Sequence, residues 1–181
     1  MVFSKAARQF VLHWGEMGSR WGVNRTVAQV HALLYLSPEA LPAEDIAEAL
    51  QVARSNVSTS LHELQNWQLV QVTHQMGDRR DFFSTSHDVW HLFLTVLEQR
   101  VEREIEPTIA TLGTLATEAL VEKQPAVTER IADMHSFLLE MHDWFQQMTK
   151  LPPSTLRRLV RVGTGITKLL PKPRMAKGEK W

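Results

Sequence analysis

The chain has 181 residues, of which 44% are hydrophobic, and its 20 basic and 20 acidic residues leave no net charge. This length supports one compact domain with a sizeable core, or a small domain with a dimerisation element. Because cysteine is absent, disulfides, thiolate metal sites and cysteine nucleophiles are excluded. The N-terminus does not resemble a secretory signal and no apolar run is long enough to span a bilayer, so we expect a cytoplasmic protein without a membrane partner.

The charges are distributed unevenly along the chain. Residues 150–181 hold nine lysines and arginines against one glutamate, so residues 1–149 carry the compensating negative charge. An acidic body with a basic tail argues against a uniformly positive surface that attracts DNA from a distance.

The first 36 residues predict two helices. Apolar residues over 3–17 recur at helical spacing, and a second helix is predicted over 26–36, where Ser37-Pro38 ends it. Glycines between the two helices predict a break or close backbone packing: Gly15, Gly18 and Gly22. We assign residues 1–36 to N-terminal helices that support or dimerise the protein.

Residues 43–86 hold the most informative pattern. A short helix over 43–50, a turn at 51–53 and a second helix over 54–67 predict a helix-turn-helix. Strands over 69–75 and 81–86, joined by a turn at 76–80, predict a hairpin that forms a wing. We therefore assign residues 37–86 to a winged helix-turn-helix DNA-binding domain.

Residues 87–149 predict a helical dimerisation region. Apolar residues recur every three or four positions from Trp90 onward, and Pro107 predicts a kink or a break. Another helix is predicted to begin at Pro125, with its apolar residues in a coiled-coil-like rhythm: Val127, Ile131, Met134, Leu138, Met141 and Phe145. These helices have more apolar surface than a small winged domain covers, so we expect them to pack on each other and on a second copy.

Residues 150–181 form a basic C-terminal tail. Its first part predicts a short amphipathic helix with Ser154 as N-cap, and its last part, from Pro171, predicts a flexible basic segment. The arginines of this tail suit DNA phosphates, the acidic body of a partner subunit or an anionic membrane surface. The apolar face of the helix favours docking on protein, and it is formed by Leu156, Leu159 and Val160.

Two sets of residues are predicted to contact DNA. A recognition helix enters the major groove by its N-terminal half, where Arg54 suits a phosphate and Asn56 suits adenine. The predicted contacts on this helix are Arg54, Ser55, Asn56, Ser58, Thr59 and His62. On the wing, Arg79 and Arg80 stand between two aspartates, and we predict that one arginine reaches the DNA backbone or minor groove. The alternative is a salt-bridged wing tip.

The segment VARSNVSTSLHELQNWQLV followed by GDRRD resembles the MarR family of winged-helix regulators, and the resemblance covers roughly residues 8–120. It is most similar to the GbsR-type branch, with FVLHWGEMGSRWGVNRTVAQVHALLYL before the helix-turn-helix. The resemblance implies a homodimeric repressor that releases its genes when an effector binds, with a link to choline and glycine-betaine metabolism. Where the family often caps the recognition helix with Ser or Thr, this chain has Ala53, which predicts a weak cap or one that lies a residue later.

The remaining candidates concern ligands and chemistry. A quaternary ammonium effector would bind aromatic faces by cation–π attraction, and the rings proposed are Trp14, Trp21 and Trp90, although such rings also suit core or dimer packing. Histidines such as His87 and His91 have no convincing metal-ligand spacing, so we expect no metal and no cofactor. No nucleophile elbow, phosphate loop or paired catalytic carboxylates indicate an enzyme.

These patterns together predict a mainly α fold with a small β-hairpin wing, namely a MarR-like winged helix-turn-helix with a helical dimerisation region. The predicted function is that of a sequence-specific transcriptional regulator, a homodimeric repressor that binds a pseudo-palindromic operator and controls compatible-solute or osmotic-stress genes. The alternative is a winged-helix protein-interaction module without specific DNA binding. Acidic residues around the motif keep this alternative open: Glu39, Glu44, Asp45, Glu48 and Glu63.

Overall fold

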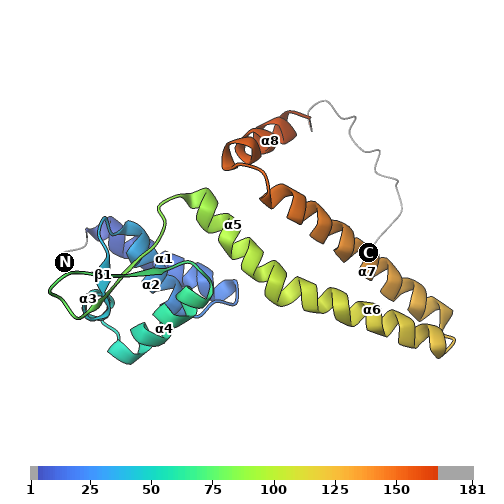
Figure 1. Ribbon diagram of the computed structural model, residues 1–181, viewed down its shortest axis with the longest axis horizontal. Helices are drawn as coiled ribbons and strands as arrows, with labels where there is room; N and C mark the ends of the chain where they lie inside the picture. The colour runs from blue at the N-terminus through green and yellow to red at the C-terminus, as the bar shows by residue number, and fades with distance from the viewer. Residues whose placement is uncertain (1–3, 167–181) are drawn as a thin grey trace. The chain divides into compact units, whose positions relative to one another are not determined.

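The computed structural model describes residues 4–166, with side chains described through Gly163 (Figure 1). Two compact units are present, the first ending at Glu106 and the second beginning at Pro107. Phe3, in the predicted first helix, and the predicted segment from Pro171 lie outside the described residues. In the described part of the chain, no helix combines the length and the apolar character that a bilayer crossing requires.

The first unit contains two N-terminal helices, a helix-turn-helix, a hairpin and one further helix. In chain order its elements are α1 (Lys5–Arg20), α2 (Arg25–Leu36), β1 (Leu41–Pro42), α3 (Ala43–Leu50), α4 (Arg54–Asn66), β2 (Gln71–His74), β3 (Asp81–Ser84), α5 (Val89–Arg100) and the π-helical turn η1 (Val101–Ile105). The predicted helix over 43–50 and the turn at 51–53 are confirmed residue for residue.

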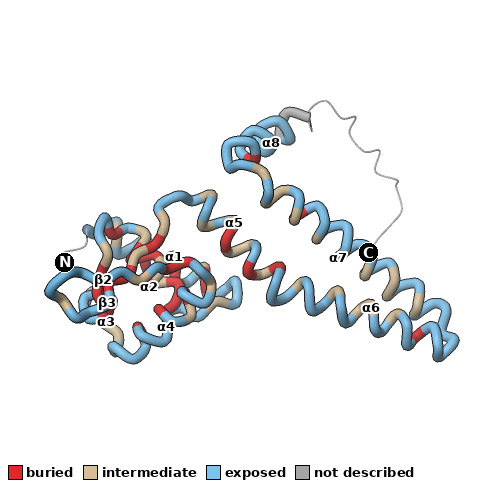
Figure 2. Tube along the Cα trace, viewed as in Figure 1, coloured by how far each residue is buried: buried red, intermediate tan, exposed pale blue. Residues whose placement is uncertain are grey.

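The core of this unit lies between α2, α3, α4 and the sheet (Figure 2). Helical spacing brings the apolar faces together, and the predicted inner residues of α4 are among the most buried side chains: Val57, Leu61 and Leu64. Val30 and Ile46 supply the facing positions on α2 and α3 and are fully buried. This packing fixes α4 by one face and leaves its other face to solvent.

The sheet has three antiparallel strands in the order β1-β3-β2. The predicted strands were too long, because β2 begins only at Gln71 and β3 ends at Ser84. Leu69 lies before the strand, and its carbonyl accepts a hydrogen bond from the Thr85 hydroxyl at 2.7 Å instead of pairing in the ladder. The sequence analysis also missed β1, whose Leu41 pairs with Phe83. A strand of two residues leaves no alternating pattern to read.

Close backbone packing, one of the two predictions for the N-terminal glycines, is confirmed at Gly15 and Gly18. Both lie inside α1, which continues to Arg20, and both are buried against α2. A Cβ at Gly18 would stand 2.5 Å from the Cβ of Ala28, and one at Gly15 would stand 2.6 Å from the Gln29 Cγ. The chain reverses only at Gly22, whose φ of +78° favours glycine.

Two arginines near the end of the first unit cap the C-terminal ends of α1 and α4. Arg100 donates from Nη2 to the carbonyl of Trp21, the C-cap residue of α1, at 2.6 Å. Arg103 donates from Nη2 to the carbonyl of Asn66, the last residue of α4, at 2.9 Å, and lies 5.7 Å from the centre of the Trp67 ring. Cations suit these positions because carbonyls at a helix C-terminus carry partial negative charge.

The predicted interruption at Pro107 takes the form of a π-helical turn just before it. The Glu106 amide donates to the carbonyl of Val101, five residues earlier, and helical residues then continue through Pro107. Proline has no amide hydrogen, so the helical ladder must lose a bond at this position, and the wider π turn accommodates that loss.

The second unit contains α6 (Glu106–Val121), α7 (Pro125–Thr149) and α8 (Pro153–Ile166). The start at Pro125 is confirmed, since proline at the first helical position loses no hydrogen bond. Of the predicted seam on α7, Phe145 is buried and Ile131 and Leu138 are half-buried. Its other members join a separate exposed stripe of α7, formed by Val127, Met134, Phe137, Met141 and Trp144.

The sequence analysis predicted Ser154 as the N-cap of α8. This prediction is wrong, because the helix already begins at Pro153. The carbonyl of Pro152 accepts the first bonds, from the amides of Thr155 and Leu156. A proline at the first helical turn fixes φ without losing a donor, so the start moves one residue earlier. On the predicted apolar face, Leu156 is buried while Leu159 and Val160 remain exposed.

Candidate nucleic-acid interface

The second helix of the helix-turn-helix, α4, begins without a side-chain cap. Ala53 occupies the N-cap position with an extended backbone (φ −61°, ψ 141°) and accepts the amides of Asn56 and Val57 through its carbonyl. No side chain bonds to the first amides of the helix, as the sequence predicted for Ala53. The start of α4 therefore offers unpaired amide donors and a positive dipole end, which together suit an anion.

The face of α4 opposite the core is polar and exposed. Every residue predicted to reach DNA from this helix lies there: Arg54, Ser55, Asn56, Ser58, Thr59 and His62. Two of these side chains are engaged within the helix, since the Thr59 hydroxyl donates to the Ser55 carbonyl and the His62 ring contacts the Asn66 amide. Ser55, Asn56 and Ser58 make no side-chain hydrogen bond to another described residue, and they present hydroxyl and amide groups at the leading end of α4.

Arg54 is paired with a carboxylate, which the sequence analysis missed. Its Nε donates to Oε1 of Glu44, near the start of α3, at 2.9 Å, and both side chains are about half exposed. The hydrogen bond from Arg54 lowers the pKa of the Glu44 carboxyl, which keeps the pair ionised at neutral pH. The two residues are ten apart in the sequence and meet only because the turn at 51–53 folds α4 back on α3.

The wing tip holds one arginine and leaves the other unpaired. Arg80 forms two hydrogen bonds to Oδ2 of Asp78, one from Nε at 3.0 Å and one from Nη2 at 2.6 Å. Its guanidinium lies 5.4 Å from the centre of the Phe82 ring. This pairing lowers the pKa of Asp78 and raises that of Arg80. Among the described residues, Arg79 has no side-chain hydrogen bond or ion pair. The other predicted aspartate, Asp81, pairs with His74 instead.

The family model described as "MarR family" matches residues 21–81, which span the helix-turn-helix and most of the wing. The chain is also 24% identical, over 153 residues and 83% of each sequence, to the HTH-type transcriptional repressor GbsR of Bacillus subtilis strain 168. A solved structure called a transcriptional regulator has the same fold, with a TM-score of 0.62 and 21% identity over 86% of this chain and 99% of the other. The winged segment thus matches the MarR family, and the chain is similar over most of its length to transcriptional regulators.

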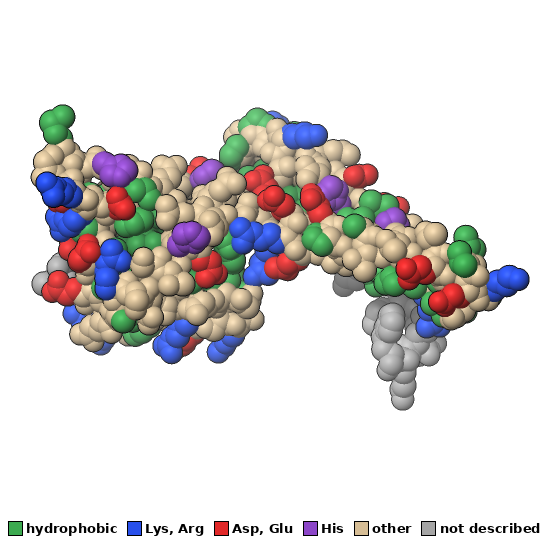
Figure 3. Space-filling model, turned by 60° about the horizontal axis from the view of Figure 1, so that its bottom comes forward, with side chains coloured by type: hydrophobic (Ala, Val, Ile, Leu, Met, Phe, Trp, Pro, Cys, Tyr) green, Lys and Arg blue, Asp and Glu red, His purple; other side chains and the backbone are tan. Residues whose placement is uncertain are grey.

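The first unit has a mixed surface charge. On the face shown in Figure 3, blue basic and red acidic side chains are interspersed, and no continuous basic surface covers the unit. Acidic residues lie close to the arginines of the site, because Glu44 pairs with Arg54 and Asp78 pairs with Arg80. Of the three arginines at this surface, Arg79 is therefore the one whose charge no carboxylate offsets among the described residues.

The tryptophans proposed for an effector have different surroundings in the structure. Trp14 is half-buried and stacks on Phe10, with 5.4 Å between ring centres. Trp90 meets Phe93 edge to face at 6.2 Å, while the Trp21 side chain is 63% exposed. Trp14 lies within α1, and Trp21 is the C-cap residue of the same helix, seven positions later.

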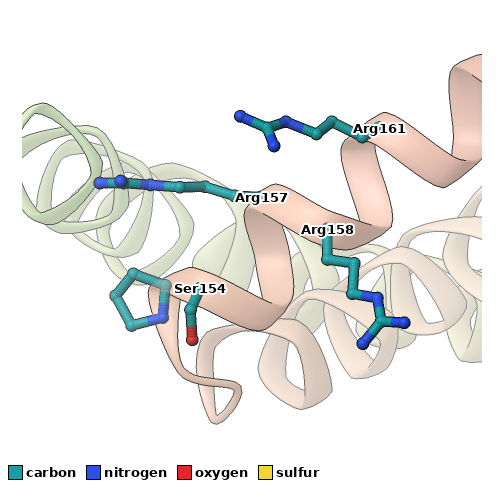
Figure 4. Close-up of a pocket in the computed structure, with 5 residues that line it drawn as sticks. Ser154, Arg157, Arg158 and Arg161 are labelled. Atoms are coloured by element: carbon teal, nitrogen blue, oxygen red, sulfur yellow. The ribbon is translucent and has the colours of Figure 1, made fainter.

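The basic helix α8 provides a second positive surface (Figure 4). Arg157, Arg158 and Arg161 line a shallow pocket with Ser154, but Arg158 points to the opposite side from the other two arginines. The three guanidinium groups therefore do not converge on one small anion. Across the described residues, no three His, Asp or Glu side chains are grouped as a metal site would require.

Proposed function

We propose that this regulator binds double-stranded DNA sequence-specifically, with α4 in the major groove and the wing in the adjacent minor groove. One observation carries the proposal: the same unit presents both an uncapped, polar leading end of α4 and, on its wing, an Arg79 without an ion-pair partner among the described residues. Ser55 and Asn56 supply donors and acceptors for base edges, and Arg79 supplies a charge for the narrow minor groove.

A homodimer would present two such units to one operator. The exposed stripe of α7 supports this part of the proposal, because Val127, Met134, Phe137, Met141 and Trp144 recur every three, four or seven residues and form one side of the helix. Two recognition helices then meet a pseudo-palindrome whose half-sites are about 10 base pairs apart. The name of the Bacillus subtilis relative, a transcriptional repressor, supports repression as the outcome of binding.

A quaternary ammonium effector, such as choline or glycine betaine, is the proposed signal, which implies control of compatible-solute or osmotic-stress genes. The exposed ring of Trp21, with Trp14 two turns earlier on α1, offers aromatic faces of the kind that bind such cations. Titration with glycine betaine should quench tryptophan fluorescence and release DNA. Trp21→Ala should lose both responses, whereas unchanged responses would remove Trp21 from the effector site.

DNA binding is tested by selection from a random double-stranded library, followed by affinity measurements on the enriched sequence over a series of salt concentrations. We expect a slope of log affinity against log salt with a magnitude between about 2 and 5, because only the three arginines of each unit lie at the site. Replacing Arg79 and Arg80 together with Ala should weaken binding and flatten the slope. If no sequence is enriched, even at low ionic strength, the proposal is wrong.

A protein-interaction module is the second candidate, and one observation favours it. Two of the three arginines at the site are already neutralised by carboxylates, Arg54 by Glu44 and Arg80 by Asp78. Such a surface can recognise another protein through paired charges as well as it can recognise phosphates. The double arginine variant separates the two candidates, since loss of a salt-sensitive DNA complex in that variant supports the DNA-binding function.

A further inference from the structure

The tip of the wing is a turn that needs nothing from the Met76 side chain. The amide of Asp78 donates to the carbonyl of Gln75 at 3.2 Å and closes a four-residue turn, with Met76 and Gly77 at its corners. Gly77 has a φ of +85°, as the third position of a type II turn requires. The Asp78 side chain then accepts the amide of Arg80 at 3.0 Å, so the tip is held by hydrogen bonds on both sides of the turn.

Met76 is the most exposed large apolar side chain among the described residues, at 106% relative exposure. The exposed apolar residues of α7 form a stripe suited to another helix, but Met76 has no apolar neighbour in its turn. Its near neighbours are Arg79, which is unpaired, and Arg80, which is tied to Asp78. A single apolar side chain beside a free cation fits a narrow, negatively charged groove better than it fits an apolar protein surface.

The minor groove of DNA has these properties. It is about 6 Å wide, with a floor of base edges, and Met is among the apolar side chains that proteins insert there. Met is also unbranched and adapts to irregular surfaces, which suits the sugar walls of the groove. Because the turn is held without it, the Met76 side chain can leave water without disturbing the wing.

We propose that Met76 enters the minor groove beside Arg79 and packs against sugars and base edges. The inference rests on the DNA-binding function proposed above and assigns the wing an apolar contact in addition to its charge. Apolar burial releases no counterions, so the contribution of Met76 persists at high salt, whereas that of Arg79 declines.

The test uses the full chain and the DNA that the unaltered protein enriches from a random library. Met76→Ala should reduce affinity about tenfold and leave the slope against salt unchanged, because an apolar contact is lost and no charge is altered. Met76→Leu should stay within about threefold of the unaltered protein, because it keeps the apolar volume. Met76→Gln should lose as much affinity as Ala, since it has a similar length but a polar end. Gln75→Ala, at the neighbouring exposed position, is the matched control.

Several outcomes would overturn the inference. If all three Met76 variants bind like the unaltered protein while Arg79→Ala binds more weakly, the wing contacts DNA without Met76. A changed salt slope in Met76→Ala would mean that the residue acts by rearranging charges. If the unaltered protein enriches no sequence, the DNA-binding function itself fails, and that result is distinct because it precedes any comparison of variants.

Discussion

At the scale of single residues, the three arginines of the α4 and wing surface differ in the charge they can give to a phosphate. Arg54 and Arg80 each hold a carboxylate, and Arg79 holds none among the described residues. Exposed ion pairs of this kind are weak because water screens them, so a phosphate can displace the carboxylate at a small cost. The paired arginines thus moderate DNA affinity, and Arg79 contributes its charge in full.

Replacing Glu44 with Gln should therefore strengthen DNA binding. The change releases Arg54 from its 2.9 Å contact, and one freed phosphate contact per unit should steepen the salt slope by about 0.9 for each unit bound. Affinity measured by fluorescence anisotropy at several salt concentrations checks both effects. Glu48→Gln removes the same charge from an exposed position of α3 and is the control. Equal gains from both variants would show that net charge, rather than release of Arg54, is responsible.

The folding stability of the first unit should fall as the pH drops below about 6.5. Burial lowers the pKa of His31 to about 4. Between about pH 6.5 and pH 4, the imidazole is therefore neutral in the folded state but protonated in the unfolded chain. The unfolding free energy is therefore highest above the unfolded pKa of His31. It falls as the pH drops to about 4, by about 3 kcal/mol at most.

Urea unfolding between pH 7 and pH 4 measures this loss. His31→Gln should flatten the dependence of the unfolding free energy on pH, whatever its effect on stability at pH 7. His13→Gln, at an exposed position of α1, should leave the dependence in place. The same pH dependence in His31→Gln as in the unaltered protein would contradict the assignment to His31.

At the scale of elements, the contact between α1 and α2 depends on Gly18. Ala in a helix interior is favoured over Gly by about 1 kcal/mol, but a Cβ at Gly18 would meet the Ala28 Cβ at 2.5 Å. Gly18→Ala should therefore lower the unfolding free energy by about 1–2 kcal/mol, since neither helix can move a backbone-attached carbon cheaply. Gly15→Ala meets the Gln29 side chain, which can change rotamer, so it should lower the unfolding free energy less than Gly18→Ala does. Thermal or urea unfolding of the two variants compares them directly.

The elements that follow strong local patterns were predictable from the sequence. The apolar spacing and turn residues gave α3, α4 and the start of α7 at Pro125, because each pattern is local to its segment. β1 was missed because its two residues are held by partners in β3, 42 and 40 residues away in the chain. Ser154 was misplaced because the preceding proline competes for the helix start.

The candidate site was predictable in part. The exposed polar face of α4 follows from helical spacing once its inner residues are known, and the sequence analysis named it. The sequence analysis also gave a salt-bridged wing tip as an alternative. Arg80 forms such a salt bridge with Asp78. The Arg54–Glu44 pair and the Arg103 cap on α4 were missed, since both depend on how separate elements meet.

At the scale of the whole molecule, the exposed stripe of α7 predicts how the protein assembles. Met134 lies within the stripe and its side chain is 53% exposed, so Met134→Glu would bury a charge without a partner in any dimer that uses this face. We expect the dimer dissociation constant to rise by at least about tenfold, measured by analytical ultracentrifugation. Ser136→Glu adds the same charge on another side of the helix and should leave the dimer intact. A dimer unchanged in Met134→Glu would place the interface elsewhere.

The arginine caps on α1 and α4 have a consequence for the order in which the first unit is completed. Arg100 reaches Trp21 across 79 residues, and Arg103 reaches Asn66 across 37. A chain synthesised from its N-terminus forms α1 and α4 before either arginine exists, so both helices begin with open C-terminal ends. Both ends are closed only when the chain has been made as far as Arg103. A fragment that ends at Ser86 would keep the helix-turn-helix and the wing. It would lack Arg103, so the C-terminal end of α4 would stay without its cap.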